Sequence, residues 1–184
     1  MSRKTFRAFL NETFDFTDDI IMDRLFKHFN KISCDDIDAE EWVAGFSIFL
    51  KGSKIKSKLL TLIHIFMLFE GSEEELVRFC FTIYDLNEDG YISREEMMTM
   101  MKNCFIVNSS EQEEEGDGVK DLVEMTLRKM DKDRDGRISL SDFQASVSEE
   151  PLLLEAFGNC LPTSQSGAEF IRKILDKTPD SGDV

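Results

Sequence analysis

Apolar residues recur every three to four positions along most of the chain, and short polar stretches separate these runs. Phe6, Phe9, Leu10 and Phe14 open the series, and Thr17 follows at a position where it can cap a second helix. Later runs of the same kind occupy residues 20–29, 42–50, 73–84, 97–105, 119–130, 143–147, 152–157 and 170–175. The pattern predicts an all-α protein in which polar loops join amphipathic helices.

One polar stretch, residues 85–96, follows the twelve-position register of a calcium-binding loop. Oxygen-bearing side chains stand at positions one, three, five and twelve, and Gly90 at position six permits a sharp turn. The residue at position seven would bind through its backbone carbonyl, and Ile92 at position eight is suited to a short strand that pairs with a second loop. The predicted ligands are Asp85, Asn87, Asp89, Tyr91 and Glu96. The stretch is therefore predicted to be an EF-hand loop.

Residues 131–142 repeat the same register, with Gly136 at position six and Ile138 at position eight. The predicted ligands of this second loop are Asp131, Asp133, Asp135, Arg137 through its carbonyl, and Asp142. Two copies predict paired EF-hands with a short β pairing between the loops. An EF-hand protein binds Ca²⁺, which takes six to eight oxygen ligands.

Position twelve differs between the two loops, because Asp142 stands where the first loop has Glu96. Aspartate is one methylene shorter, so it supplies two oxygens only if the loop contracts. Ligation through one oxygen suits the six-coordinate shell of Mg²⁺ better than the larger shell of Ca²⁺. The second loop is predicted to be weaker for Ca²⁺ or shared with Mg²⁺; the alternative is that Asp142 is not a ligand.

A third stretch, residues 30–41, keeps the frame of the loop but not its ligands. Ile37 and Glu41 fall at positions eight and twelve, whereas Ile32, Cys34 and Asp35 occupy positions three, five and six. This stretch is predicted to be structural and free of metal.

The distance from Asn30 to Asp85 is 55 residues, whereas neighbouring EF-hands usually repeat at about 36–40 residues. The surplus falls in residues 53–72, whose apolar run from Leu59 to Phe69 is shorter than the ~20 residues of a membrane-spanning helix. Three interpretations stay open: an internal or partner-facing helix, a membrane-interface segment, or an insertion without a role of its own.

The expected organisation has four parts. Residues 1–52 form an amino-terminal lobe with the degenerate hand, 53–72 an apolar insertion, 73–148 the paired EF-hands, and 149–184 a helical tail. An acidic linker is expected at 108–118 between the paired hands.

Composition narrows the classes of partner. The net charge of -15 argues against nucleic acid and against an anionic membrane as primary partners. Sixteen Phe and nine Met beside one Trp suit an apolar groove that repacks around a partner. The methionine-rich run 97–101 is interpreted either as ordinary core or as the lining of such a groove, and the tail at 170–175 either docks in the groove or does not.

The four cysteines, at positions 34, 80, 104 and 160, show no CxxC or zinc-binding spacing and are expected to be reduced thiols of an intracellular protein. No signal peptide is expected, and Ser2 stands where N-myristoylation requires glycine. The sequence has no nucleophile-elbow, phosphate-loop or HExxH pattern, so no enzymatic activity is expected.

Five segments of the chain resemble the calaxins, a branch of EF-hand proteins related to the neuronal calcium sensors. They are residues 17–26 (TDDIIMDRLF), 40–53 (EEWVAGFSIFLKGS), 85–97 (DLNEDGYISREEM), 121–139 (DLVEMTLRKMDKDRDGRIS) and 152–162 (LLLEAFGNCLP). The last segment lies outside any metal loop and distinguishes this family from other EF-hand proteins. Relatives have a metal-competent loop where residues 30–41 stand, and they lack most of residues 54–71.

The resemblance implies a calcium-responsive regulator of axonemal outer-arm dynein, located in the cytoplasm and in the axoneme of cilia and flagella. The implied partners are a dynein heavy chain, proteins of the outer-arm docking complex, and tubulin or microtubules. The residues themselves leave three functions open: a calcium sensor that exposes apolar surface, a calcium buffer that barely opens, or a constitutive structural subunit.

Overall fold

The computed structural model describes residues 1–31, 36–50, 73–106 and 115–177. Its elements in chain order are α1 (Arg3–Phe14), α2 (Asp19–Phe29), α3 (Ala39–Phe49), α5 (Glu73–Tyr84), β1 (Tyr91–Ile92), α6 (Arg94–Ile106), α7 (Glu115–Met130), β2 (Ile138–Ser139), α8 (Leu140–Glu149), the 3₁₀ turn η2 (Pro151–Glu155) and α9 (Ser164–Lys177). The prediction of a helical protein with one short β pairing is confirmed. The predicted insertion at 53–72 and most of the predicted linker lie outside the described residues.

Helix boundaries follow local capping chemistry. Asp18, rather than the predicted Thr17, caps α2, because its carboxylate accepts hydrogen bonds from the backbone N–H of Ile20 at 2.8 Å and of Ile21 at 3.1 Å. Helix α7 begins at Glu115, so the last residues of the predicted linker are helical. The predicted helix at 152–157 is a 3₁₀ turn that starts at Pro151.

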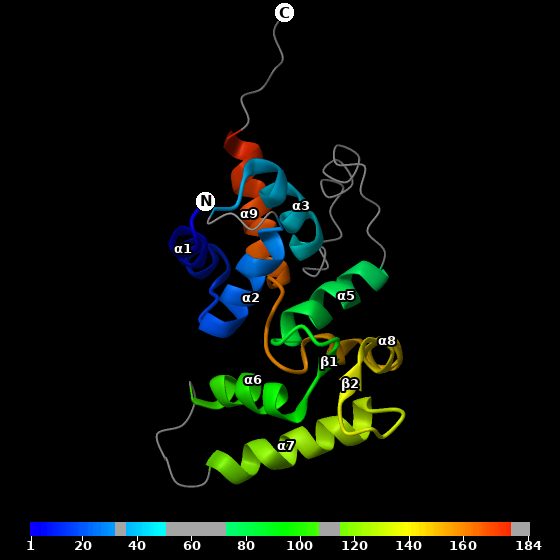
Figure 1. The fold of residues 1–184 in the computed structure, drawn as a ribbon. Coiled ribbons are helices and arrows are strands. Elements are labelled where there is room, and N and C mark those ends of the chain that lie inside the picture. Colours follow the sequence, from blue (N-terminus) through cyan, green and yellow to red (C-terminus); the bar gives the residue numbers. More distant parts are fainter. Residues whose placement is uncertain (32–35, 51–72, 107–114, 178–184) are drawn as a thin grey trace, which may run out of the picture.

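The helices form two groups that meet at α5 (Figure 1). Helices α1, α2, α3 and α9 lie together in the upper part of the view, and α6, α7, α8 and the two strands lie below them. Helix α5 packs against α2 and α3 on one side and against α8 on the other. The metal loop that follows α5 therefore begins at the junction of the two groups.

An aromatic cluster fills the upper group of helices. Phe46 of α3 lies at its centre, with its ring centroid 5.1 Å from that of Phe29 and 4.3 Å from that of Trp42. Phe170 of α9 adds its ring to the cluster, 5.3 Å from Phe14 and 5.7 Å from Phe9. Of the two interpretations left open for the tail, the structure has a docked one, with α9 on the amino-terminal helices.

In the lower group the hydrophobic core continues around Tyr84 and Phe143. The Tyr84 hydroxyl donates to the carbonyl of Gly158 at 2.6 Å, which ties the segment after α8 back to α5. Of the methionine-rich run, Met97, Met100 and Met101 are buried, so in this structure they belong to the core. Within the described ranges no helix is both long and apolar enough to cross a membrane.

Candidate metal centres

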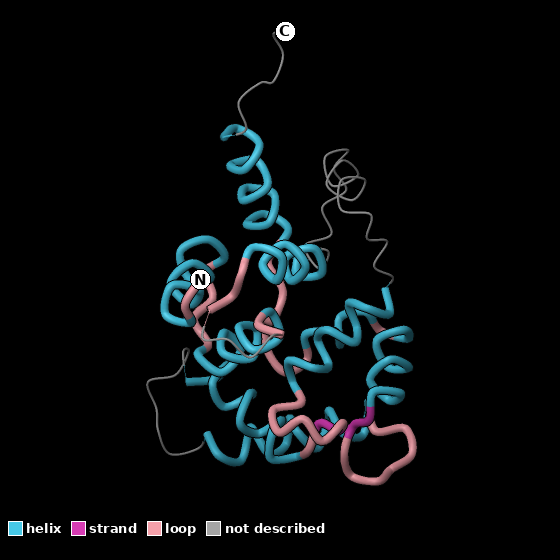
Figure 2. The backbone as a smooth tube through the Cα atoms, turned by 45° about the horizontal axis from the view of Figure 1, so that its top comes forward, coloured by secondary structure: helices cyan, strands magenta, loops and turns pink. Residues whose placement is uncertain are grey.

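Two short strands hold the predicted metal loops beside each other (Figure 2). Strands β1 and β2 are antiparallel, with Tyr91 opposite Ser139 and Ile92 opposite Ile138. Both isoleucines are fully buried. The predicted pairing at position eight of each loop is therefore confirmed.

The first loop leaves α5 at Tyr84 and enters α6 at Arg94, and it turns at two residues with positive φ. Gly90 has φ 86°, in the left-handed region that glycine adopts without a steric penalty. The carboxylate of Asp85 accepts hydrogen bonds from the backbone N–H of Gly90 at 2.9 Å and of Asp89 at 3.2 Å. These bonds curl the loop around the carboxylate at position one.

Glu96 closes the first loop from the start of α6. One carboxylate oxygen accepts from the backbone N–H of Leu86 at 2.8 Å and of Asn87 at 3.0 Å. The other accepts from the Ser93 backbone N–H at 2.7 Å and from its hydroxyl at 2.8 Å. Glu96 is 7% exposed, so its carboxylate lies inside the loop and joins both ends of it.

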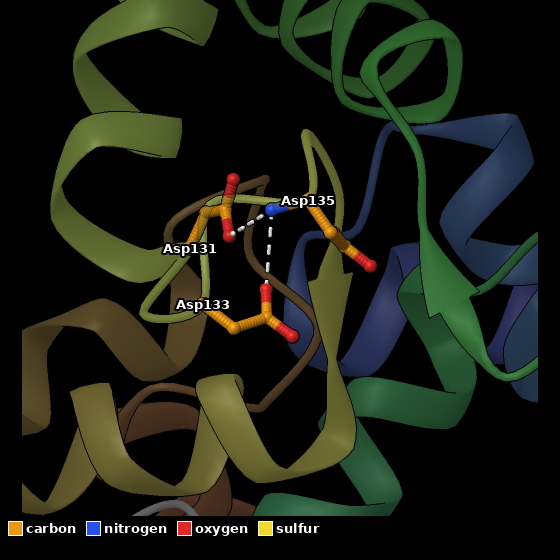
Figure 3. A group of neighbouring side chains, drawn as sticks. All are labelled: Asp131, Asp133 and Asp135. Carbon is orange, nitrogen blue, oxygen red and sulfur yellow. Dashed lines mark hydrogen bonds between the residues drawn. The ribbon is translucent and has the colours of Figure 1, made fainter.

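The second loop brings three carboxylates together (Figure 3). The carboxylates of Asp131, Asp133 and Asp135 supply oxygen atoms that all lie within 4.8 Å of one another. Asp131 and Asp133 each accept a hydrogen bond from the backbone N–H of Asp135 at 3.2 Å. Gly136, with φ 89°, donates its backbone N–H to Asp131 at 2.9 Å, as Gly90 does in the first loop.

Asp142 holds the second loop less tightly than Glu96 holds the first. One Asp142 oxygen accepts from Ser139, through its backbone N–H at 3.0 Å and its hydroxyl at 2.5 Å. The other oxygen meets the backbone N–H of Lys132 at 3.3 Å, longer than the equivalent bonds of Glu96. The shorter side chain reaches back toward the start of the loop with one long bond, which agrees with the difference expected from its length.

The electrostatics of the first loop favour a bound cation. Burial raises the pKa of Asp85, the neighbouring Glu96 carboxylate adds to the rise, and the backbone N–H of Gly90 opposes it. A divalent cation between such oxygens would relieve this repulsion, and oxygen donors are the ligands that Ca²⁺ and Mg²⁺ prefer. The donor sets of both loops therefore fit a hard cation, and the individual ligand assignments stay predictions.

Arg137 has a role that its position in the register did not predict. Its guanidinium donates to an Asp135 oxygen at 3.0 Å and lies 3.5 Å from the centroid of the Tyr91 ring in the other loop. These contacts raise the pKa of Arg137, chiefly through the hydrogen bond to Asp135. The side chains at position seven of the two loops thus touch, although only their carbonyls were predicted to matter.

The degenerate hand keeps the closing carboxylate of a metal loop. Glu41 is 8% exposed, and it accepts from the backbone N–H of Lys31 at 2.8 Å and of Asp38 at 3.1 Å. Residues 32–35, which carry the substituted positions, lie outside the described residues. Asp36 forms an isolated antiparallel bridge with Ser2. Glu41 therefore closes this stretch as Glu96 closes the first metal loop, and its structural, metal-free role stays a prediction.

Comparisons with known proteins agree with the geometry. A family model for an EF-hand domain pair matches residues 73–148. The chain is 46% identical over 180 residues to a calaxin from Xenopus laevis, which covers 98% of the chain and 77% of the relative. It is 42% identical over 184 residues to a calaxin from Homo sapiens, at 100% and 78% coverage. It is also 41% identical over 177 residues to a calaxin from Danio rerio, at 96% and 75% coverage.

Paired loops, the strand between them and the matched domain pair define an EF-hand protein. The combination supports a calcium-binding sensor. The full-length matches are more specific: the chain belongs to the calaxin family.

Proposed function

We propose that this protein is a calcium sensor that binds Ca²⁺ at the loops 85–96 and 131–142. The second loop also accepts Mg²⁺, because Asp142 is shorter than glutamate. Calcium binding reorients the helices around each loop and exposes a surface rich in Phe and Met to a partner helix.

The observation that carries the proposal is the position of the two closing carboxylates. Glu96 and Asp142 lie almost fully inside their loops, at the first turns of α6 and α8. A cation that pulls on either carboxylate must therefore pull on the helix that carries it. The β1–β2 pairing links the two loops, so binding at one loop is felt at the other.

The family resemblance suggests which motor complex the proposed sensor regulates. We propose that the protein regulates outer-arm dynein in the axoneme of cilia and flagella, and with it ciliary motility. The proposed partners are a dynein heavy chain, docking-complex proteins and tubulin. Because this protein has a net charge of -15, it would bind basic or apolar surfaces of these partners rather than acidic ones.

A sensor must bind its partner unequally in its two states, because a ligand shifts an equilibrium only by its differential affinity. Met97, Met100 and Met101 are buried in the described structure. Their exposure on calcium binding would distinguish a sensor from a calcium buffer, which barely opens.

A second candidate function, a constitutive structural subunit, rests on the degenerate hand. In that hand Ile32 and Cys34 stand at positions three and five, where the other two loops have oxygen-bearing side chains. A lobe of this kind can hold a partner whether or not calcium is present.

Calorimetric calcium titration in millimolar Mg²⁺ separates these functions when it is combined with a probe of apolar exposure, such as ANS fluorescence. A sensor shows two sites, loses one in Asp85→Ala, and gains ANS fluorescence with calcium. A buffer binds calcium without that gain. Calcium-independent capture of outer-arm dynein components by the parent chain and by an Asp85→Ala/Asp131→Ala variant alike would favour the structural subunit.

A further inference from the structure

Arg24 reaches from α2 into the beginning of the first metal loop. The residue is 9% exposed, and its guanidinium donates to the backbone carbonyl of Thr82 at 2.6 Å and of Asp85 at 2.7 Å. Its remaining hydrogen bonds go to the carbonyl of Ile83 at 3.3 Å, the carbonyl of Leu86 at 3.3 Å and the carboxylate of Glu88 at 2.9 Å. These five hydrogen bonds equal the five N–H donors of a guanidinium.

The bonded carbonyls belong to the last turn of α5 and the first residues of the loop. Carbonyls at the end of a helix lack partners within the helix and carry the negative end of its dipole. A guanidinium from another helix therefore caps α5 at the point where the loop begins. Because Asp85 is both a predicted ligand and an Arg24 partner, any movement of its backbone moves this cap.

A second attachment holds the loop at position four. Glu88 has φ 62°, and its carboxylate pairs with Arg24 and with the Lys27 ammonium at 2.6 Å. The two cations lower the pKa of Glu88, chiefly through the hydrogen bond to Lys27. Glu88 lies between Asn87 and Asp89, so α2 holds the side chain of the loop residue between two predicted ligands.

We propose that Arg24 is a positioning residue that couples metal binding in the loop 85–96 to the placement of α2 in the amino-terminal helices. This inference rests on the proposed function, because it requires the loop to bind calcium. The coupling is reciprocal: the seated α2 shapes the loop for the cation, and the bound cation fixes the position of α2.

The amino-terminal helices contain a natural reporter of this coupling. Trp42, the sole tryptophan of the chain, lies on α3, away from both metal loops. Contacts lead to it from α2, because Phe29 of α2 lies 5.1 Å from Phe46, which in turn lies 4.3 Å from Trp42. A calcium-dependent change in Trp42 emission therefore requires transmission from the loop into this group of helices.

The test uses the full chain with Asp131→Ala, so that calorimetric heats report the first loop alone. In this background Arg24→Met keeps most of the side-chain volume but removes its hydrogen-bond donors. Arg24→Lys keeps the positive charge but loses the planar array of guanidinium N–H donors. Arg7→Met is the matched control, because Arg7 pairs with Asp19 and Asp23 inside the amino-terminal helices and does not contact the loop. Each variant is titrated with calcium by calorimetry and by Trp42 fluorescence.

We expect calcium to shift Trp42 emission in the parent and in Arg7→Met. Arg24→Met should still bind calcium, at least about fivefold more weakly, and should lose the Trp42 response. Arg24→Lys should fall between the two. A role of Arg24 in stability alone would leave the Trp42 response of the folded, calcium-bound variant intact.

An unchanged Trp42 response in calcium-bound Arg24→Met overturns the coupling, and so does a parent that binds calcium without any Trp42 response. Neither result touches the proposed calcium binding. A parent that binds no calcium overturns both proposals. If circular dichroism shows Arg24→Met to be unfolded, Glu88→Gln takes its place, because it weakens the same attachment from a half-exposed position. Glu88→Gln with the parent's affinity and Trp42 response then overturns the coupling.

Discussion

At the scale of single residues, we expect the first metal site to depend most on Glu96. Its two oxygens join both ends of the loop from a buried position. Glu96→Gln keeps the shape and removes the negative charge, so we expect calcium affinity at this loop to fall at least tenfold, about 1.4 kcal/mol. Calorimetric titration in the Asp131→Ala background measures the change.

Glu95→Gln is the matched control, because the neighbouring Glu95 is exposed and carries the same charge. Its affinity should stay near that of the parent. Equal affinities of Glu96→Gln and the parent would remove Glu96 from the ligand set.

Asp142 is the residue that we expect to set the choice of cation at the second loop. Its long 3.3 Å bond to Lys132 shows how far the shorter side chain reaches. Asp142→Glu should supply a second ligand oxygen and raise the preference of the second loop for Ca²⁺ over Mg²⁺. Calcium titrations in an Asp85→Ala background, with and without Mg²⁺, measure this preference. In the variant, Mg²⁺ should lower the apparent calcium affinity less than it does in the parent. An unaltered preference would mean that Asp142 is not a ligand.

His28 makes stability depend on pH. It packs edge-on against Phe79, with ring centroids 4.7 Å apart. Burial, aided by the charges of Lys31 and Arg24, lowers its pKa to about 4 from the ordinary 6.5. Since the folded pKa lies below the unfolded one, this contribution is complete above pH 6.5 and is lost as the pH falls toward 4, by up to about 3 kcal/mol.

Urea unfolding with chelator present, at pH 7 and at pH 5, measures this contribution. We expect His28→Gln to lose less stability between the two pH values than the parent does, whatever its stability at pH 7. Carboxylates titrate in both proteins and contribute equally to the loss of unfolding free energy between pH 7 and pH 5. Subtracting the loss in the variant from the loss in the parent therefore leaves the contribution of His28. Identical losses in the parent and the variant would contradict a buried neutral His28.

At the scale of elements, α9 completes the aromatic cluster of the amino-terminal helices. Phe170 contacts Phe9, Phe14 and Phe46, whereas Ile174 on the same helix is 45% exposed. Phe170→Ala should lower the free energy of unfolding by about 2 kcal/mol, less than for a fully buried ring because Phe170 is partly exposed.

Ile174→Ala is the control on the same helix, and we expect a change within about 0.5 kcal/mol. Denaturant unfolding of both variants measures the difference. The same loss of stability in both would mean that the ring contacts of Phe170 contribute no more than an exposed side chain of α9 does.

At the scale of the whole molecule, local sequence patterns predicted most features of the two loops. Contacts between residues far apart in the chain were the features that the sequence predicted least. The register of each loop fixes which residues face inward, so the pairing of Ile92 with Ile138 followed from position eight alone. Arg24 was not predicted, because its partners lie about sixty residues away in the chain and a single arginine in a helix carries no sign of them. The sequence likewise did not fix the first residue of α2, because Thr17 and Asp18 are adjacent and both can form an N-cap.

Crowded carboxylates should make the stability of the whole fold depend on metal. The three aspartates of the second loop lie within 4.8 Å of one another in a chain of net charge -15, so their repulsion opposes folding until a cation binds. A cation that binds only the folded state at a hundredfold excess over its dissociation constant adds about 2.7 kcal/mol per site. For a chain of this size that raises the Tm by roughly 5–10 °C per occupied site.

Thermal unfolding followed by circular dichroism, in calcium and in chelator, tests this dependence. Asp85→Ala/Asp131→Ala should melt at one temperature in both conditions, since both sites are disabled. Added monovalent salt should raise the Tm of the parent in chelator by screening the repulsion among its exposed carboxylates. If the parent has the same Tm in calcium and in chelator, calcium does not stabilise its folded state. Calcium could then not act through these loops, because an ion that acts through a site must bind the folded protein there.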